Sequence, residues 1–273
     1  MFFKKKYLII FENNFFQIEI ENISIFKELG DIIKNYILQE LNNKNSDLIV
    51  MLNFLKIIKI SQEGFVSSPH IMIESNENKI NLPISIYFLR KEEKNQIQET
   101  FKHEITHLYQ RNKTYLIKYF YTKRKQIISK KNIFKLNRIS ERVDIHDFFY
   151  LTIIEGFARY IEGNNLNYNY KNEYNNLKKK LSEIKSEIIY LKKFSYDTLD
   201  IGENSLYYDL GKNVIYTIIT NTNIPFLELV EMKFKKILEL YENIMFKKLN
   251  LQPLITYSSE KGILDYRKII LKI

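Results

Sequence analysis

The stretch FKHEITHLYQ, residues 101–110, decides how the middle of the chain is interpreted. Apolar residues recur through it and just before it at the spacing of one helix face, at Ile97, Phe101, Ile105 and Leu108. A helix with one apolar face is therefore predicted here. His103 and His107 are four residues apart, so both project from the same side of this helix, one turn from each other.

His103, Glu104 and His107 form the pattern H-E-x-x-H. Two histidines at this spacing can bind one metal ion at about 2.0–2.1 Å. Glu104 points about 100° around the helix from His103, beside such a metal and within reach of a metal-bound water, where a general base is needed. The alternative is an amphipathic helix with incidental histidines. The chain has only four histidines, so a chance match has a probability on the order of 1 in 100 or less.

A catalytic zinc site needs a third protein ligand. The extended pattern H-E-x-x-H-x-x-G-x-x-H is excluded, because Gln110 and Lys113 occupy the positions of its glycine and its last histidine. The stretch TIIEGFARYIEG, residues 152–163, offers Glu155 instead. Glu155 lies in an apolar run, where a carboxylate is costly to bury unless it is paired or bound to a metal. The alternative is a Glu155 that is merely half exposed.

Small residues beside Glu155 favour close helix packing. Gly156 and Ala158 would let this helix approach the first one closely enough for a short carboxylate to reach a shared metal. A glycine inside a helix costs about 1 kcal/mol, which suggests a packing reason. His146, nine residues before Glu155, is interpreted as part of a helix cap rather than as a ligand. His70 is expected to begin a strand and is given no role.

The residues HEITH (103–107) and EGFARYIE (155–162) resemble the motifs of the gluzincin metallopeptidases. They are most similar to the aminopeptidase N-like group of the peptidase MA-like clan, whose second motif reads E-G-F-A-x-Y-x-E. In that group a tyrosine in a Y-x-x-G helix start stabilises the oxyanion, and YDLG (208–211) begins 53 residues after Glu155. Three motifs in the same order make the resemblance specific, over roughly residues 80–245.

The resemblance implies a role for each matched residue. His103, His107 and Glu155 would bind zinc, with water in the fourth position. Glu104 would polarise that water and then carry its proton to the leaving amine, while zinc lowers the pKa of the water to about 7. Tyr208 would donate a hydrogen bond to the tetrahedral oxyanion.

Two further residues receive supporting roles from the same resemblance. Tyr207 is the alternative to Tyr208 as the oxyanion donor. Glu162 lies two turns after Glu155 on the same face. We expect it to contact and orient a ligand histidine without binding the metal itself. The alternative for Tyr208 is an ordinary core or surface tyrosine, since the chain has 20 of them.

The chain departs from the aminopeptidases in two places. The gap between His107 and Glu155 is 47 residues, much longer than is usual there. The insert, residues 111–142, carries eleven Lys or Arg and one acidic residue. We interpret it as a solvated helical excursion, the alternative being a basic lid that selects acidic substrates. No G-x-M-E-N-like strand, which recognises a free substrate N-terminus in the aminopeptidases, precedes the zinc helix. This absence favours an endopeptidase or a processing enzyme.

The first 89 residues are interpreted as a small mixed β-sheet region. The predicted elements are a helix at residues 26–41 and strands at residues 7–11, 15–20, 48–60, 70–74 and 80–88. The first two strands would form a hairpin. Pro83 lies in the last strand, and because proline cannot donate to a ladder, this strand is predicted at a sheet edge. Such an edge could align an extended peptide by strand addition.

From residue 90 the pattern is helical. Further helices are predicted at residues 147–162, 177–191, 205–220 and 225–248. Pro225 would open the last of them, with Asn223 as a possible cap. The predicted fold is α+β: a small mixed-sheet region, residues 1–89, followed by a mainly α-helical zincin-type catalytic lobe, residues 90–273, with the basic insert 111–142.

Composition limits both the chemistry and the partners. The chain has 273 residues, no cysteine and a formal net charge of +10. Any transition metal must therefore be held by histidines and carboxylates. A basic chain can bind nucleic acid, an anionic membrane or acidic substrates, but the abundance of Lys, Asn and Ile throughout is the simpler explanation. Charged and polar residues break the longest apolar run, residues 48–60, so no membrane span is expected and the cytoplasm is the expected location.

We expect a zinc peptidase that acts on a peptide or protein substrate. One alternative is a catalytically inactive relative used for binding, against which stand the intact Glu104 and three ligands. The other is a basic nucleic-acid-binding protein with structural zinc or none. Structural zinc sites usually have four protein ligands, often cysteines, and no nucleic-acid motif is present.

Overall fold

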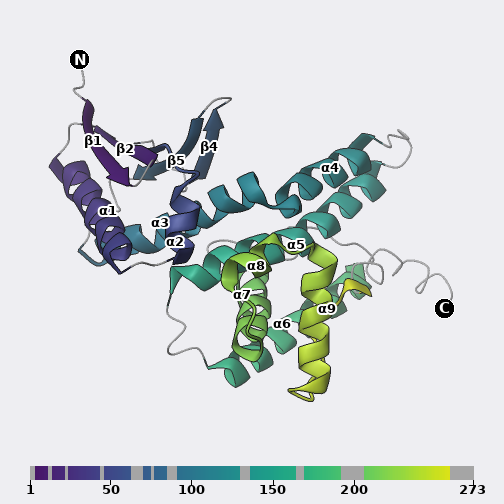
Figure 1. The fold of residues 1–273 in the computed structure, drawn as a ribbon. Helices are drawn as coiled ribbons and strands as arrows, with labels where there is room; N and C mark the ends of the chain where they lie inside the picture. Colours follow the sequence, from purple (N-terminus) through teal and green to yellow (C-terminus); the bar gives the residue numbers. More distant parts are fainter. Residues whose placement is uncertain are drawn as a thin grey trace. The chain divides into compact units, whose positions relative to one another are not determined.

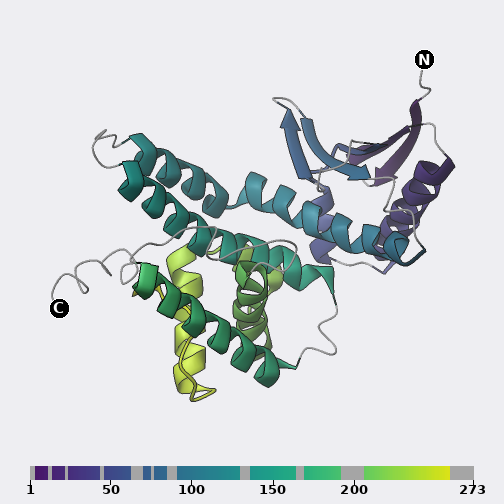
Figure 2. The same cartoon turned by 180° about the vertical axis from the view of Figure 1, so that it is seen from behind.

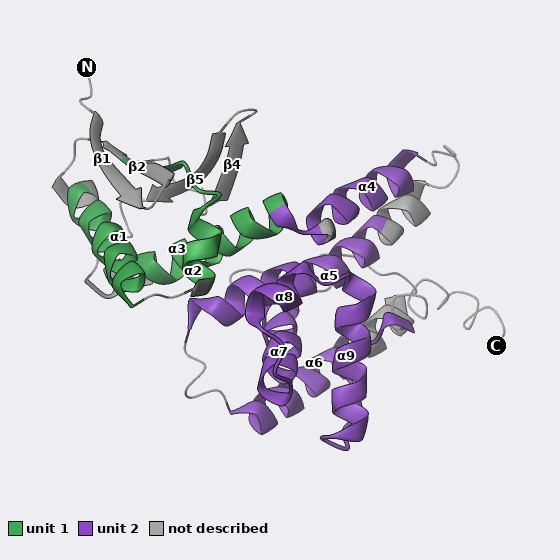
Figure 3. Cartoon of the chain, in the orientation of Figure 1, with its two compact units in different colours: residues 1–112 green, residues 113–273 purple. Residues whose placement is uncertain are grey.

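The computed structural model describes ten stretches of the chain, residues 4–11, 14–21, 24–43, 46–62, 70–74, 77–84, 91–129, 136–163, 169–191 and 206–258. Most of these residues are helical, and the first 84 residues contribute one β-sheet (Figure 1). The chain divides into two compact units, Met1–Asn112 and Lys113–Ile273 (Figure 3). The boundary expected near residue 90 falls inside the first unit, between its last strand and the helix that carries His103 and His107.

The sheet of the first unit has five strands in the order β1-β2-β3-β5-β4. The strands are β1 Lys4–Phe11, β2 Asn14–Glu21, β3 Ile57–Gln62, β4 His70–Glu74 and β5 Glu77–Ile84. β1 and β2 pair antiparallel, with Tyr7 opposite Ile18, which confirms the predicted hairpin. β2 and β3 pair parallel, as do β3 and β5, while β4 returns antiparallel to β5. The sheet is therefore mixed.

The prediction that Pro83 lies on an edge strand is wrong. β5 lies between β3 and β4, and Pro83 stands opposite Ser61 of β3. The described ladder between β5 and β4 ends at Asn81, opposite His70. On that side no described strand runs beside Pro83, so its missing N–H interrupts no ladder there. The edge strands are β1 and β4, so the sheet order does not support strand addition along β5.

The predicted strand over residues 48–60 is wrong in its first half. Residues Ser46–Leu52 form helix α2, and β3 begins only at Ile57. Leu48, Met51 and Leu52 are at most 3% exposed, and they lie three and four residues apart, which is the spacing of one helix face. A short apolar run of this kind is ambiguous between helix and strand until the packing on one side is known.

Two longer helices complete the first unit, α1 Ser24–Asn42 and α3 Lys91–Lys113, and both were predicted. Each contributes a stripe of side chains with no exposed surface: Leu29, Ile33 and Ile37 from α1, and Ile97, Phe101, Ile105 and Leu108 from α3. Burying one such side chain contributes about 1.5–3 kcal/mol. This apolar stripe fixes the rotation of α3 about its axis and so leaves the two histidines on another part of its surface.

The described residues of the second unit are helical apart from short connections. The helices are α4 Tyr115–Ser129, α5 Leu136–Glu162, α6 Tyr170–Leu191, α7 Leu206–Asn221, α8 Phe226–Glu231 and α9 Phe234–Lys247. The helices predicted over residues 147–162, 177–191 and 205–220 are confirmed, with α5 and α6 beginning earlier. Across all the described stretches, no helix combines the length and the apolar character needed to cross a membrane.

The single helix predicted over residues 225–248 is wrong. α8 ends at Glu231 and α9 begins at Phe234, because Met232 and Lys233 have extended ψ angles of 153° and 141°. Pro225 does stand directly before α8, where its fixed φ is compatible with a helix start. Its own ψ is 147° and no side chain caps the helix, so Asn223 is not a cap.

The basic insert begins as a helix, as expected. α4 pairs with α5, and the two lie side by side in both views (Figures 1 and 2). Arg124 of α4 donates through Nε to Asp147 Oδ2 of α5 at 2.9 Å. One of the eleven basic residues of the insert is thus used to join the two helices.

Candidate metal centre

His103 and His107 lie in the middle of α3, one turn apart, and both are half-buried. Their rings meet edge to face, with centroids 4.6 Å apart and planes at 83°. The two Nε2 atoms are 3.0 Å apart, which is hydrogen-bond distance, so one ring donates a proton that the other accepts. The helix therefore directs the Nε2 atoms of both rings toward each other.

The spacing of these nitrogens fits a shared metal ion. Two nitrogens that each lie about 2.0–2.1 Å from a tetrahedral zinc are about 3.3 Å apart. The observed Nε2–Nε2 distance of 3.0 Å differs from this by a few tenths of an ångström. Small χ rotations of two half-buried rings are enough to close that difference.

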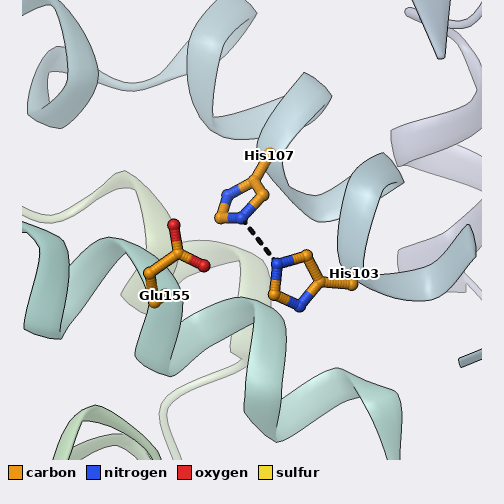
Figure 4. A group of neighbouring side chains, drawn as sticks. All are labelled: His103, His107 and Glu155. Atoms are coloured by element: carbon orange, nitrogen blue, oxygen red, sulfur yellow. Dashed lines mark hydrogen bonds between the residues drawn. The ribbon is translucent and has the colours of Figure 1, made fainter. Parts of the chain in front are cut away.

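Glu155, on α5 of the second unit, supplies the third potential ligand. A carboxylate oxygen of Glu155 and one nitrogen each of His103 and His107 all lie within 4.8 Å of one another (Figure 4). Two imidazoles and one carboxylate are a donor set that zinc accepts, and one coordination position remains open. Of the residues that the structure describes, these three form the group able to hold a metal ion, so the three predicted ligands are brought together.

Glu104 is a buried carboxylate next to the first histidine. Its side chain is 5% exposed, and a carboxylate at that burial must be hydrogen-bonded or paired to remain charged. It lies in the same turn of α3 as His103, as the H-E-x-x-H pattern requires. Its role as a general base stays a prediction.

Tyr208, on α7, lies in the electrostatic field of Glu155. Burial first, and then the negative charge of Glu155, raise the pKa of the Tyr208 phenol above its ordinary value; a hydrogen bond with the Tyr207 side chain raises it further. The rings of Tyr207 and Tyr208 are 4.4 Å apart. A phenol with a raised pKa keeps its proton and remains a hydrogen-bond donor, as an oxyanion donor must.

Two glycines bring Tyr208 close to Glu155. Gly156 of α5 faces Gly211 of α7, and a Cβ on Gly156 would lie 2.5 Å from the carbonyl carbon of Gly211. The sequence predicted that Gly156 lets its helix approach the helix of residues 101–110; the close approach that requires this glycine is instead to α7. Because Tyr208 precedes Gly211 by one turn, the glycine contact places the tyrosine beside the turn that carries Glu155.

Glu162 has a defined partner within its own helix. Arg159 Nη1 donates to Glu162 Oε2 at 3.0 Å, and the Arg159 guanidinium lies 4.6 Å from the centre of the Tyr208 ring. The pair thus supports the tyrosine through a cation–π contact. The role predicted for Glu162, orienting a ligand histidine, stays a prediction.

The structure corrects the interpretation of His146. It lies in the interior of α5, not at a helix cap, and is 2% exposed. Its ring stacks against both Phe120 and Tyr150, with centroids 5.2 and 4.6 Å away, and its Nδ1 lies 3.1 Å from Asp147 Oδ1. His146 is not a member of the metal-ligand group; it packs α4 against α5. His70 begins β4, as expected.

One residue at the site was missed. The sequence predicts no role for Gln110, which is only a mismatch to the extended histidine pattern. In the structure its Oε1 lies 2.9 Å from His107 Nδ1. The spacing of three residues on one helix is the signal that would have found it, because residues i and i+3 are neighbours on the helix surface.

Comparison of the chain with models of known protein families, with curated proteins and with solved structures finds no match.

Proposed function

We propose that this chain is a zinc-dependent metallopeptidase of the gluzincin type, with His103, His107 and Glu155 as the metal ligands. The observation that carries the proposal is the meeting of three ligand atoms within 4.8 Å, although Glu155 follows His107 by 48 positions in the sequence. The mixed sheet followed by helices supports the α+β zincin arrangement that such a peptidase would have. Three protein ligands with one open position are typical of catalytic rather than structural zinc.

The proposed reaction uses five side chains: the three metal ligands, Glu104 as the base and Tyr208 as the oxyanion donor. A zinc ion held by the three ligands would supply a Lewis acid and lower the pKa of a water molecule near it. Glu104 accepts the proton of the water that attacks the peptide carbonyl, and then gives that proton to the leaving nitrogen as the C–N bond breaks. The products are one carboxylic acid and one amine, so water and one peptide bond are consumed.

Tyr208 is proposed to stabilise the charge that develops on the carbonyl oxygen. The phenol donates one hydrogen bond, and the contact with Arg159 at 4.6 Å fixes the ring that carries it. Arg159 is in turn held by Glu162 at 3.0 Å. A donor that is positioned before the reaction contributes more than one that must be reoriented during it.

The proposed substrate is a peptide or protein, and the proposed location is the cytoplasm. The choice of an endopeptidase or processing enzyme over an aminopeptidase now rests on the missing G-x-M-E-N-like strand alone, because Pro83 is not on an edge strand. The rival of a nucleic-acid-binding protein rests only on the net charge of +10, and a steep salt dependence of nucleic-acid binding would favour it.

The experiment compares peptide hydrolysis by the wild type and by Glu104→Gln. Both proteins are purified, loaded with zinc and incubated with a mixture of unblocked and end-blocked peptides, whose cleavage is followed by mass spectrometry. We expect the wild type to cleave peptides of the mixture, and we expect this cleavage to stop when a chelator removes the metal. Glu104→Gln is expected to lose at least 100-fold in rate, the lower range for general acid–base catalysis, while still binding zinc.

Cleavage of end-blocked peptides would identify an endopeptidase. Equal cleavage by wild type and Glu104→Gln would contradict the assigned mechanism, because the activity would then not depend on the base. Zinc binding with no cleavage of any peptide would favour the inactive binding protein.

A further inference from the structure

A buried glutamine contacts the ring nitrogen of His107 that faces away from the other histidine. Gln110 has no exposed surface, and its Oε1 lies 2.9 Å from His107 Nδ1. Both residues belong to α3, so one helix holds the whole contact. A buried side chain without room to rotate fixes the ring more strictly than a solvent-exposed partner does.

The contact defines where the proton of His107 lies. With the Gln110 amide oriented so that Oε1 faces the ring, as in the structure, the oxygen can only accept a hydrogen bond, and Nδ1 carries the hydrogen. A neutral imidazole has one such hydrogen, which leaves Nε2 with a free lone pair. Nε2 is the atom that lies 3.0 Å from His103 Nε2. In the absence of a metal, His103 is therefore the donor of that bond and His107 is the acceptor.

We propose that Gln110 is a positioning residue for the metal site: it holds the proton of His107 on Nδ1 and so presents Nε2 in the form that binds a metal. This inference rests on the proposed metal centre. Histidine ligands of metals almost always donate their second N–H to a carboxylate, a backbone carbonyl or water. In this chain a neutral side-chain amide takes that place.

Three variants test the inference in the full-length chain. Gln110→Met keeps the length of the side chain but replaces the amide oxygen with a thioether sulfur, which is only a weak acceptor. Gln110→Glu keeps an oxygen at the same reach and adds charge. Gln98→Met makes the same exchange on the same helix at a half-buried position, five residues before His103, and serves as the matched control.

The first measurement is the dissociation constant for zinc, obtained by competition with a chromogenic chelator. Gln110→Met is expected to bind 10–100-fold more weakly than wild type, the usual loss when a ligand histidine is deprived of its partner. Gln110→Glu is expected to stay within a few-fold of wild type, and Gln98→Met to match it. Circular dichroism and thermal unfolding check that each variant folds.

The second measurement needs no metal. The ¹⁵N chemical shifts of the His107 ring in the metal-free chain report which nitrogen carries the proton. Wild type and Gln110→Glu are expected to show a protonated Nδ1 and an unprotonated Nε2, whereas Gln110→Met is expected to show a mixture of the two tautomers. A purely structural role of Gln110 would not change the tautomer.

The outcomes separate this inference from the proposed function. Unchanged zinc affinity in Gln110→Met, with zinc bound by wild type, would overturn the inference alone. Equal weakening by Gln110→Met and Gln110→Glu would also overturn it, since only the packing would then matter. A wild-type chain that binds no zinc would overturn both proposals.

Discussion

Tyr208 is held as a neutral phenol by its surroundings. Burial and the charge of Glu155 both raise its pKa, because each disfavours the phenolate. The contact with the Arg159 guanidinium at 4.6 Å orients the ring. These contacts lie within the second unit and require no metal, so the proposed donor is prepared before any substrate binds.

Removing the phenolic hydroxyl tests this role. Tyr208→Phe is expected to lower kcat for peptide hydrolysis by about 10²–10³-fold, the range for loss of one oxyanion donor, with little change in zinc content. Tyr207→Phe is the matched control, and a much smaller loss is expected. The measurement is steady-state hydrolysis of one cleaved peptide. A larger loss in Tyr207→Phe would transfer the role to Tyr207.

The raised pKa of Tyr208 leads us to expect that the free energy of unfolding falls at alkaline pH. Because the folded-state pKa of Tyr208 is raised above 10.0, the folded chain binds the proton more tightly than the unfolded chain does. The stabilisation is complete below pH about 10, and it is lost as the pH rises from there toward the folded-state pKa. Unfolding by urea between pH 9 and 11 is expected to show a steeper loss in wild type than in Tyr208→Phe. Parallel curves for the two proteins would contradict this.

The role of Glu104 could be predicted from the sequence, whereas the contact of Gln110 with His107 could not. A carboxylate between two histidines at helical spacing belongs to a motif whose chemistry is defined by three positions. Gln110 belongs to no such motif, and its importance depends on which way the His107 ring turns. That rotation is set by packing, which the sequence does not specify.

At the scale of helices, the site depends on the crossing of α5 and α7. Gly156 and Gly211 allow the two backbones to meet, and a Cβ on Gly211 would overlap the carbonyl oxygen of Thr152. A glycine inside a helix lowers stability unless the packing requires it. Here the packing does require it at both positions.

Gly211→Ala is expected to destabilise the chain by about 1–3 kcal/mol, the range for overpacking a well-filled contact. It should also lower activity, because Tyr208 would move away from Glu155. Thr220→Ala, at an exposed position near the end of the same helix, is the control and should change the free energy of unfolding by no more than about 0.5 kcal/mol. The measurement is urea unfolding. A neutral Gly211→Ala would show that the two helices do not need this contact.

The helices also differ in how well their apolar periodicity predicts them. α1 and α3 have long apolar stripes, and both helices were predicted, α3 with its stripe residues Ile97, Phe101, Ile105 and Leu108. Residues 48–60 form a short apolar run that divides into α2 and β3, since neither its length nor its composition decides between helix and strand. The break between α8 and α9 has no glycine or proline to mark it; two extended residues, Met232 and Lys233, make the turn.

The sequence correctly predicts that Pro83 and Gly156 have special surroundings, but it assigns Pro83 to the wrong position in the sheet and Gly156 to the wrong partner helix. A proline in a strand does need a side without a ladder, and the part of the β4–β5 ladder that the structure describes ends at Asn81, before Pro83. A helical glycine does need a close neighbour, and Gly156 has one in α7. The local sequence thus predicts that a strand proline lacks a hydrogen-bonded neighbour on one side and that a helical glycine packs closely against another element. Which strand or helix that is depends on the tertiary fold.

For the chain taken as one piece, the proposed ligands come from two helices that are far apart in the sequence, His103 and His107 from α3 and Glu155 from α5. The net charge of +10 does not define a site. One shared metal ion is therefore tested by removing one proposed ligand and measuring the metal held by the entire chain.

The most direct measurement is the zinc content per chain by elemental analysis, in wild type, Glu155→Ala and Glu239→Ala. Glu239 is an exposed glutamate on α9, with 52% of its side chain accessible, and serves as the control. We expect one zinc per chain in wild type and in Glu239→Ala, and loss or marked weakening of zinc binding in Glu155→Ala. Wild type without zinc after reconstitution, or full retention of zinc by Glu155→Ala, would rule out the proposed metal centre.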